Sequence, residues 1–175
     1  MNRRTVALTV TATAAVTTGT LLIALAQADP DSPSAPAGPP ELFASCLSSQ
    51  EGALTALPAQ TGDSPNRKRL LECANGAWKL YINEYPSSDR WLVSGPELKL
   101  HGQGLRNPEF MAGHWTGTPQ TPEAQCRAVY VDVIGAGQTG DPQTVTADPG
   151  RPASFDASEH LFNITLTGNC LWERS

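Results

Sequence analysis

The chain has few basic residues. Among its 175 residues, 12 are Lys or Arg and 17 are Asp or Glu. Two of the bases, Arg3 and Arg4, belong to an N-terminal segment treated below, and the rest of the chain keeps all 17 acids, for a formal charge of −7. A chain of this charge repels phosphate backbones, and no basic stripe offsets the repulsion. Nucleic acid is therefore not an expected partner.

The chain also lacks the short motifs of common catalytic and metal sites. It contains no C-x₂-C, no H-E-x-x-H and no G-x-S-x-G, which mark structural zinc sites, zinc proteases and α/β-hydrolases. Gly135–Gly140 matches G-x-G-x-x-G after an expected strand, but Asp141-Pro142 blocks the helix that a dinucleotide site needs. We interpret this segment as a flexible loop and expect no cofactor.

Only three histidines occur, His101, His114 and His160, and no two have the spacing of paired metal ligands. A site of two histidines and a carboxylate is conceivable if His101 and His114 converge across a loop that carries Glu109. The simpler interpretation is polar strand surface. We predict no metal and no catalytic residue, with a hydrolytic site built from residues far apart in the sequence as an alternative.

The N-terminus has the order of features that is typical of a secretory signal. Arg3 and Arg4 precede an uncharged, apolar and Thr-rich run from Thr5 to Ala26, and Ala26-Gln27-Ala28 is a small-x-small cleavage site. We predict a signal peptide over residues 1–28 that is removed on export. Retention as a membrane anchor is the alternative, since about 20 apolar residues span a bilayer. The paired arginines leave both Sec and Tat export open.

The mature chain is expected to be secreted or held in the cell envelope. Its Ala-, Thr-, Pro- and Gly-rich composition is typical of a GC-rich bacterial genome. Residues 29–41 form a Pro-rich linker, because proline fixes φ and removes N–H donors. Residues 42–175 then make one domain with room for a hydrophobic core. Pro and Gly recur about every 8–12 residues between short alternating runs, which predicts an antiparallel β-sandwich, Ig-like, or a small barrel.

Asn75-Gly76 is the strongest local signal, because both central residues of a two-residue hairpin turn need positive φ. A turn there pairs Ala74 with Ala77 and places Glu72 opposite Lys79. One face of the hairpin is then apolar, made of Leu71, Cys73, Trp78, Leu80 and Ile82. A short helix over Arg67–Ala74 is the alternative for the first arm.

Further strands are expected where apolar residues alternate. Val129, Val131 and Val133 should face one way, and Phe162, Ile164 and Leu166 should face the core. Pro40–Leu57 is the one segment with enough spaced apolar residues for a short amphipathic helix. The expected strands are Arg90–Ser94, Glu97–His101, Met111–Thr118, Cys126–Ile134, Gln143–Ala147, Pro152–Phe155 and Leu161–Thr167.

Four cysteines allow three pairings, and in an exported chain they are expected to form disulfides. We favour Cys126–Cys170, because antiparallel strands over 126–134 and 161–170 place the start of one beside the end of the other. The second pair is then Cys46–Cys73. Closing the loop of roughly 45 residues in the first pair should stabilise the fold by about 4 kcal/mol.

Four tryptophans are many for a domain of this size. Trp78 and Trp91 alternate with aliphatic residues and are expected in the core. Trp115, with His114 beside it, and Trp172 near the C-terminus are the candidates for an exposed contact surface. His101 is a further, weaker candidate.

These features predict a non-enzymatic exported β-domain that binds an unknown protein or cell-envelope component. Besides the hydrolase, the alternatives are a ligand-carrying barrel and a secreted enzyme inhibitor. The inhibitor would present Gly102–Phe110 or Gly135–Pro142 as a rigid loop. Membrane contact is expected only through the N-terminal segment, and only if that segment is not cleaved.

Overall fold

A computed structural model describes residues 39–61 and 68–175, all within one compact unit. The predicted signal peptide and the linker up to residue 38 lie outside the described residues, as does Arg67. Within the described ranges, no helix has the length and apolar character that a membrane crossing requires.

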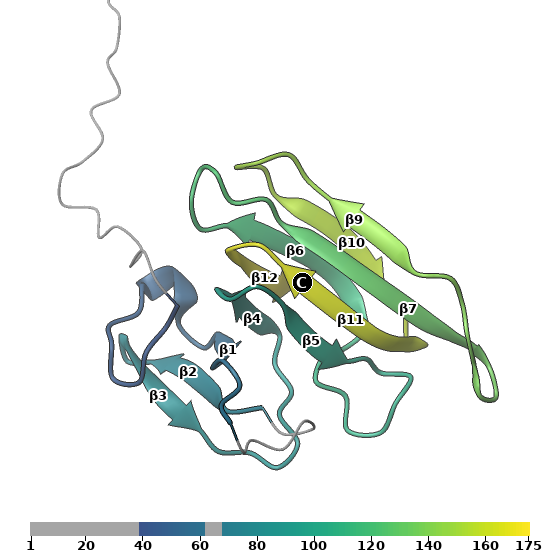
Figure 1. Cartoon of the computed structure of the whole chain (residues 1–175), viewed down its shortest axis with the longest axis horizontal. Helices are drawn as coiled ribbons and strands as arrows, with labels where there is room; N and C mark the ends of the chain where they lie inside the picture. The colour runs from purple at the N-terminus through teal and green to yellow at the C-terminus, as the bar shows by residue number, and fades with distance from the viewer. Residues whose placement is uncertain (1–38, 62–67) are drawn as a thin grey trace, which may run out of the picture. The chain divides into compact units, whose positions relative to one another are not determined.

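Strands dominate the described part of the chain (Figure 1). The one short 3₁₀ helix in it, η1, covers Ser48–Gln50. The twelve strands there are β1 Leu54–Ala56, β2 Leu70–Ala74, β3 Ala77–Tyr81, β4 Arg90–Val93, β5 Leu98–His101, β6 Gly113–Pro119, β7 Arg127–Gly135, β8 Gln138–Thr139, β9 Gln143–Thr146, β10 Ala153–Ala157, β11 Leu161–Thr167 and β12 Cys170–Arg174.

The strands form two open sheets. The seven-stranded sheet has the order β10-β6-β12-β4-β1-β2-β3, and the five-stranded sheet has the order β5-β11-β7-β8, with β9 also paired to β7. All strand pairs are antiparallel except β1 with β4, which is parallel. The all-β, sandwich-like architecture is the predicted one, and since neither sheet closes on itself it is not a barrel.

The main core lies between the two sheets. Aromatic rings fill its centre, with Phe110 stacked on Trp115 at 3.7 Å between centroids and Tyr130 stacked on Phe155 at 5.0 Å. Burying a large apolar side chain stabilises a fold by about 1.5–3 kcal/mol. The buried members contributed by both sheets include Trp91, Trp115, Trp172, Leu100, Ile164 and Leu166.

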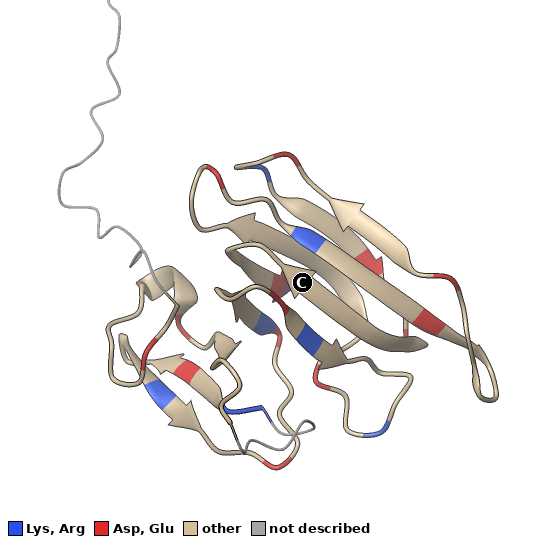
Figure 2. Cartoon of the chain, viewed as in Figure 1, with Lys and Arg blue, Asp and Glu red and all other residues tan. Residues whose placement is uncertain are grey.

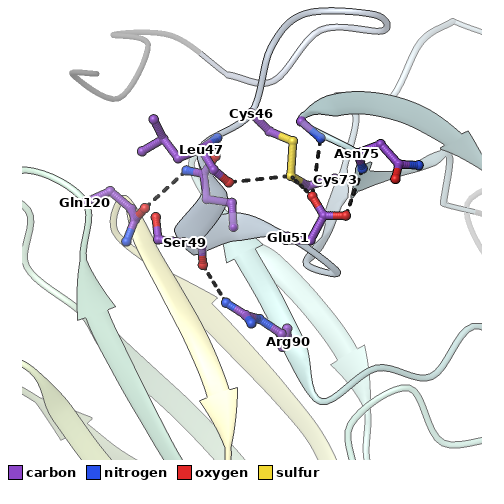
Figure 3. Close-up of a disulfide and its surroundings, with 10 residues drawn as sticks. Cys46, Leu47, Ser49, Glu51, Cys73, Asn75, Arg90 and Gln120 are labelled. Atoms are coloured by element: carbon purple, nitrogen blue, oxygen red, sulfur yellow. Dashed lines mark hydrogen bonds between the residues drawn. A yellow bond between two sulfur atoms is a disulfide. The ribbon is translucent and has the colours of Figure 1, made fainter. Parts of the chain in front are cut away.

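A second, smaller core lies on the outer face of the seven-stranded sheet. Residues 39–53, which we name the N-terminal cover, pack there over Leu71, Trp78, Leu92 and Leu171. The short amphipathic helix considered over Pro40–Leu57 does not form, since that range holds η1 and the strand β1 instead. The cover is pinned instead by the bonds of its own turns and of η1, and by the Cys46–Cys73 bridge (Figure 3).

The Asn75-Gly76 hairpin is confirmed. Asn75 and Gly76 have φ of 55° and 73°, and β2 pairs with β3 in the predicted register from Ala74–Ala77 outward. Of the predicted apolar face, Leu71, Cys73 and Trp78 are buried, but Leu80 is 52 % and Ile82 is 85 % exposed. The face is buried only where the N-terminal cover lies over it.

The strand over Leu161–Thr167 is confirmed as β11, the other strand predictions hold with shifted ends, and β1, β8 and β12 were not predicted. Val129 and Val131 share the outer face of the five-stranded sheet, since the alternate residue Ala128 is buried. The inward placement of Phe162 is wrong. A register shift between Leu161 and Asn163 turns Leu161 into the core instead, and Phe162 is half-buried.

Both predicted disulfides are present, Cys46–Cys73 and Cys126–Cys170, and the described residues include no free cysteine. The Cα atoms lie 5.9 Å and 5.8 Å apart in the two bridges. Disulfides persist in oxidising compartments. The pairing therefore indicates an extracytoplasmic environment.

Candidate functional site

The two tryptophans predicted as a contact surface are fully buried, so the expectation that they are exposed is wrong. Trp115 stacks on Phe110 and donates its indole N–H to Met111 O (2.8 Å). Trp172 packs edge-on against Phe155, with 5.8 Å between centroids. Their strands, β6 and β12, lie in the interior of the seven-stranded sheet, and the facing sheet covers both indoles.

His114 lies on the other side of β6, on the outer face of the seven-stranded sheet. Its Nδ1 is 2.8 Å from Asp156 Oδ1 on β10, and the two side chains are 48 % and 85 % exposed. Thr116 of β6 is paired with Ser154 of β10, and Thr116 Oγ1 lies 3.0 Å from Ser154 Oγ. A serine nucleophile needs a histidine in contact with it, whereas the Ser154 hydroxyl bonds to Thr116. The arrangement is an exposed polar row.

His101 is exposed on the opposite outer face, on β5 of the five-stranded sheet, and is paired with Asn163 of β11. It lines a pocket of about 300 Å³ together with Lys68 and Lys99. Buried Glu109 accepts the backbone N–H of His101 (2.9 Å) and binds Lys68 Nζ through both carboxylate oxygens (2.8 and 2.7 Å). The charge of Lys68 is therefore neutralised by Glu109 at the pocket wall.

The four candidate residues consequently do not form one site. His101 and His114 lie on the outer faces of different sheets, so the two-histidine site with Glu109 is not assembled. Within 39–61 and 68–175, the group whose possible metal-ligand atoms lie within 4.8 Å of one another is Cys46, Glu51 and Cys73. The two sulfurs are bonded to each other, and a disulfide sulfur is not the thiolate that metals bind.

Glu51 has a structural role that its contacts define (Figure 3). Its carboxylate accepts the backbone N–H groups of Asn75 (2.8 Å) and Gly76 (3.3 Å). These bonds hold the pKa of Glu51 below its ordinary value, because they favour the ionised form. The contact ties the cover to the β2–β3 turn beside the disulfide.

The two loops considered for an inhibitor differ. Gly102–Phe110 is bound to β11 through Gly102 N to Phe162 O (3.0 Å) and Gly104 N to Leu161 O (2.7 Å). The flexible loop predicted over Gly135–Gly140 is wrong in part, because it contains β8, which pairs back onto β7.

The exposed apolar residues concentrate elsewhere, at the edge of β3. Five of the six large, exposed apolar side chains of the described residues belong to the N-terminal cover or to β3 and the residues after it. We name four of them the β3 patch: Leu42, Phe43, Leu80 and Ile82, which are 44 %, 79 %, 52 % and 85 % exposed. Tyr85, at 53 %, lies three residues further along.

Backbone bonds place the two halves of the patch together. The cover runs along the free edge of β3, where Phe43 N donates to Trp78 O and Trp78 N donates to Ala44 O, both at 2.8 Å. Leu80 lies two residues after Trp78 and so projects on the same side of the strand. The patch therefore continues the smaller core past the last bond between the cover and β3.

A strained turn directs the cover away from β3 at this point. Ala44 N bonds to Glu41 O (3.0 Å), and Phe43 within that turn has a φ of 68°. This left-handed region suits glycine or asparagine and is a genuine outlier for an aromatic residue, costing about 1–2 kcal/mol. Such strain persists where the surrounding structure over-determines it, and it concentrates at functional sites.

The two segments that carry the patch contain acidic residues and no basic ones apart from Lys79. Figure 2 shows acids and bases interspersed over the strands without a continuous basic stripe. Glu41 precedes Leu42 and Glu84 follows Ile82, and both are exposed. No Lys or Arg occurs in residues 39–53 or 80–88. Lys79 projects from the opposite side of β3, since it alternates with Trp78 and Leu80.

Sequence reasoning missed this site because alternation shows which residues share a face but not how far that face is covered. The signal that was available is Phe43, an aromatic residue between a proline pair and a cysteine, in a segment for which a short helix was one of the options. Comparison of the chain with protein-family models, curated proteins and solved structures found no match.

Proposed function

We propose that the mature chain is a non-enzymatic, exported β-sandwich domain that binds a protein or cell-envelope partner through the β3 patch. The observation that supports this most is the concentration of exposed apolar side chains at one strand edge. Single exposed apolar residues are common on protein surfaces, whereas a contiguous cluster marks an interaction site. The oxidised cysteines fit an extracytoplasmic location.

The absence of an assembled nucleophile and base in the described residues supports a binding role. His114 contacts Asp156, but the nearby Ser154 hydroxyl contacts Thr116. Binding through apolar side chains needs no such pair, and it needs area that is rigidly presented. The hairpin, the bridge and the Glu51 contact supply that rigidity on the β3 side.

Affinity capture from an envelope extract of the source cells tests the proposal. The immobilised mature domain is compared with Ile82→Ser and with a matched control, Ile134→Ser, whose side chain is 68 % exposed on β7 far along the chain. We expect one protein or envelope component to bind the unchanged domain and the control, to be lost with Ile82→Ser, and to rebind when purified. Equal capture by both variants, or no specific capture, contradicts the proposal.

A further inference from the structure

The free edge of β3 offers backbone groups as well as side chains. The outward N–H and C=O of Trp78 are bonded to the cover. In an antiparallel strand, backbone groups two residues apart point the same way, so those of Leu80 point outward too. Among the described residues, no backbone group pairs with them on that side.

The same edge of β3 already binds another segment, the N-terminal cover. Ser45 forms an antiparallel bridge with Ala77, and the bonds to Trp78 follow. The turn at Glu41–Ala44 then directs the cover away just before it reaches Leu80. A strand from another molecule that lies next to Phe43 would bind the outward N–H and C=O of Leu80, the first such groups that the cover does not reach.

Resting on the proposed binding role, we infer that the ligand of the β3 patch is an extended, apolar and basic segment of another protein, which adds as a short strand to the open edge of β3. Strand addition of this kind obtains affinity from main-chain bonds and specificity from alternate side chains. The alternate side chains here meet Leu80, Ile82 and Phe43, so they are apolar.

Charge determines which residues are favoured at the ends of the incoming segment. Glu41 and Glu84 flank the apolar residues in sequence, residues 39–53 and 80–88 contain no Lys or Arg, and the mature chain has a formal net charge of −7. Basic residues at the ends of the incoming segment are therefore attracted, and acidic ones are repelled. The same charges disfavour a second copy of this chain, because pairing β3 with β3 brings the acidic flanks of both copies together.

The probe is a labelled octapeptide of alternating valine and lysine, titrated into the ¹⁵N-labelled mature domain. The matched peptide has glutamate at every lysine position. We expect amide shifts confined to residues near 42–44 and 78–84, slowed exchange of the Leu80 amide, and about fivefold tighter binding of the lysine peptide, the ratio that two exposed charge pairs supply. Raised salt should remove most of that ratio.

Two variants separate the parts of the inference. Leu80→Pro removes an N–H that points away from β2, so it should abolish binding while leaving the ladder intact. Ile82→Lys is a second variant that cannot disturb packing, since the side chain is 85 % exposed; it should weaken the lysine peptide, whereas Ile134→Lys should not.

Failure of this inference is distinguishable from failure of the proposed function. If a natural partner is captured in an Ile82-dependent way but the lysine peptide binds no better than the glutamate peptide, the strand-addition ligand is refuted and the binding role stands. A concentration-dependent dimer that Ile82→Lys dissociates also overturns the inference, because the occupant is then a second copy. Retained binding by folded Leu80→Pro overturns the main-chain mode.

Discussion

Removal of the Cys46–Cys73 bridge should destabilise the domain by an amount that depends on the length of the loop that the bridge closes. The bridge closes a loop with a sequence separation of 27, and Cys126–Cys170 closes one of 44. In the chain-entropy description these loops are worth about 3.5 and about 4 kcal/mol. The Cys46→Ala/Cys73→Ala variant is therefore expected to lose about 3.5 kcal/mol of unfolding free energy, nearly as much as the Cys126→Ala/Cys170→Ala variant.

Reducibility should differ even though the stabilisation is similar. Both sulfurs of Cys126–Cys170 lie in residues that are 0 % exposed, whereas Cys46 is half-buried. A thiol reductant reaches Cys46 first, since exchange requires access to a sulfur. Urea unfolding followed by Trp fluorescence measures the free energies, and timed alkylation with mass spectrometry measures the order. A loss under about 1 kcal/mol, or earlier opening of Cys126–Cys170, would refute the reasoning.

Three further changes test individual contacts. Because backbone bonds lower the pKa of Glu51, its stabilisation is present above the ordinary carboxyl pKa and lost as pH falls through the lowered value. Glu51→Gln should therefore reduce the dependence of urea stability on pH below the ordinary pKa of 4.5. A Cβ at Gly117 falls 2.7 Å from the Trp172 ring, so Gly117→Ala should lower thermal stability by about 2–3 kcal/mol. Lys68→Met leaves Glu109, whose side chain is 8 % exposed, without its ion-pair partner and should cost about 3 kcal/mol in urea unfolding.

The features that the sequence predicted correctly have a clear signal in one or two short stretches of residues. Asn75-Gly76 determines a two-residue turn by its backbone preference, and that turn alone sets the β2–β3 register. The pairing of Cys126 with Cys170 was predicted from the antiparallel order of two strands, although Cys170 lies at the start of β12 and not at the end of β11. The turn needs only neighbouring residues, whereas the disulfide also needs the antiparallel pairing of β7 with β11, two strands that the alternation of apolar residues marks clearly.

The predictions that failed concern what lies over a strand. Trp115 and His114 are adjacent, so one must face inward, but alternation cannot say which until the facing sheet is placed. Trp172 lies in β12, which inserts between β4 and β6 from the far end of the chain. Such an insertion depends on contacts between distant segments, and it places Trp172 in the core under the facing sheet.

The β3 patch also depends on what lies over a strand, but here the covering segment is too short and leaves part of the strand exposed. Trp78 and Leu80 share a face and differ only in that the cover reaches one of them. The reach of the cover is set by two neighbouring features, the bridge at Cys46 and the left-handed turn residue Phe43 three positions before it. A glycine at position 43 would allow the same turn without strain, so the fold alone does not explain an exposed phenylalanine there. The contact with another molecule that we propose would account for both its chemistry and its position.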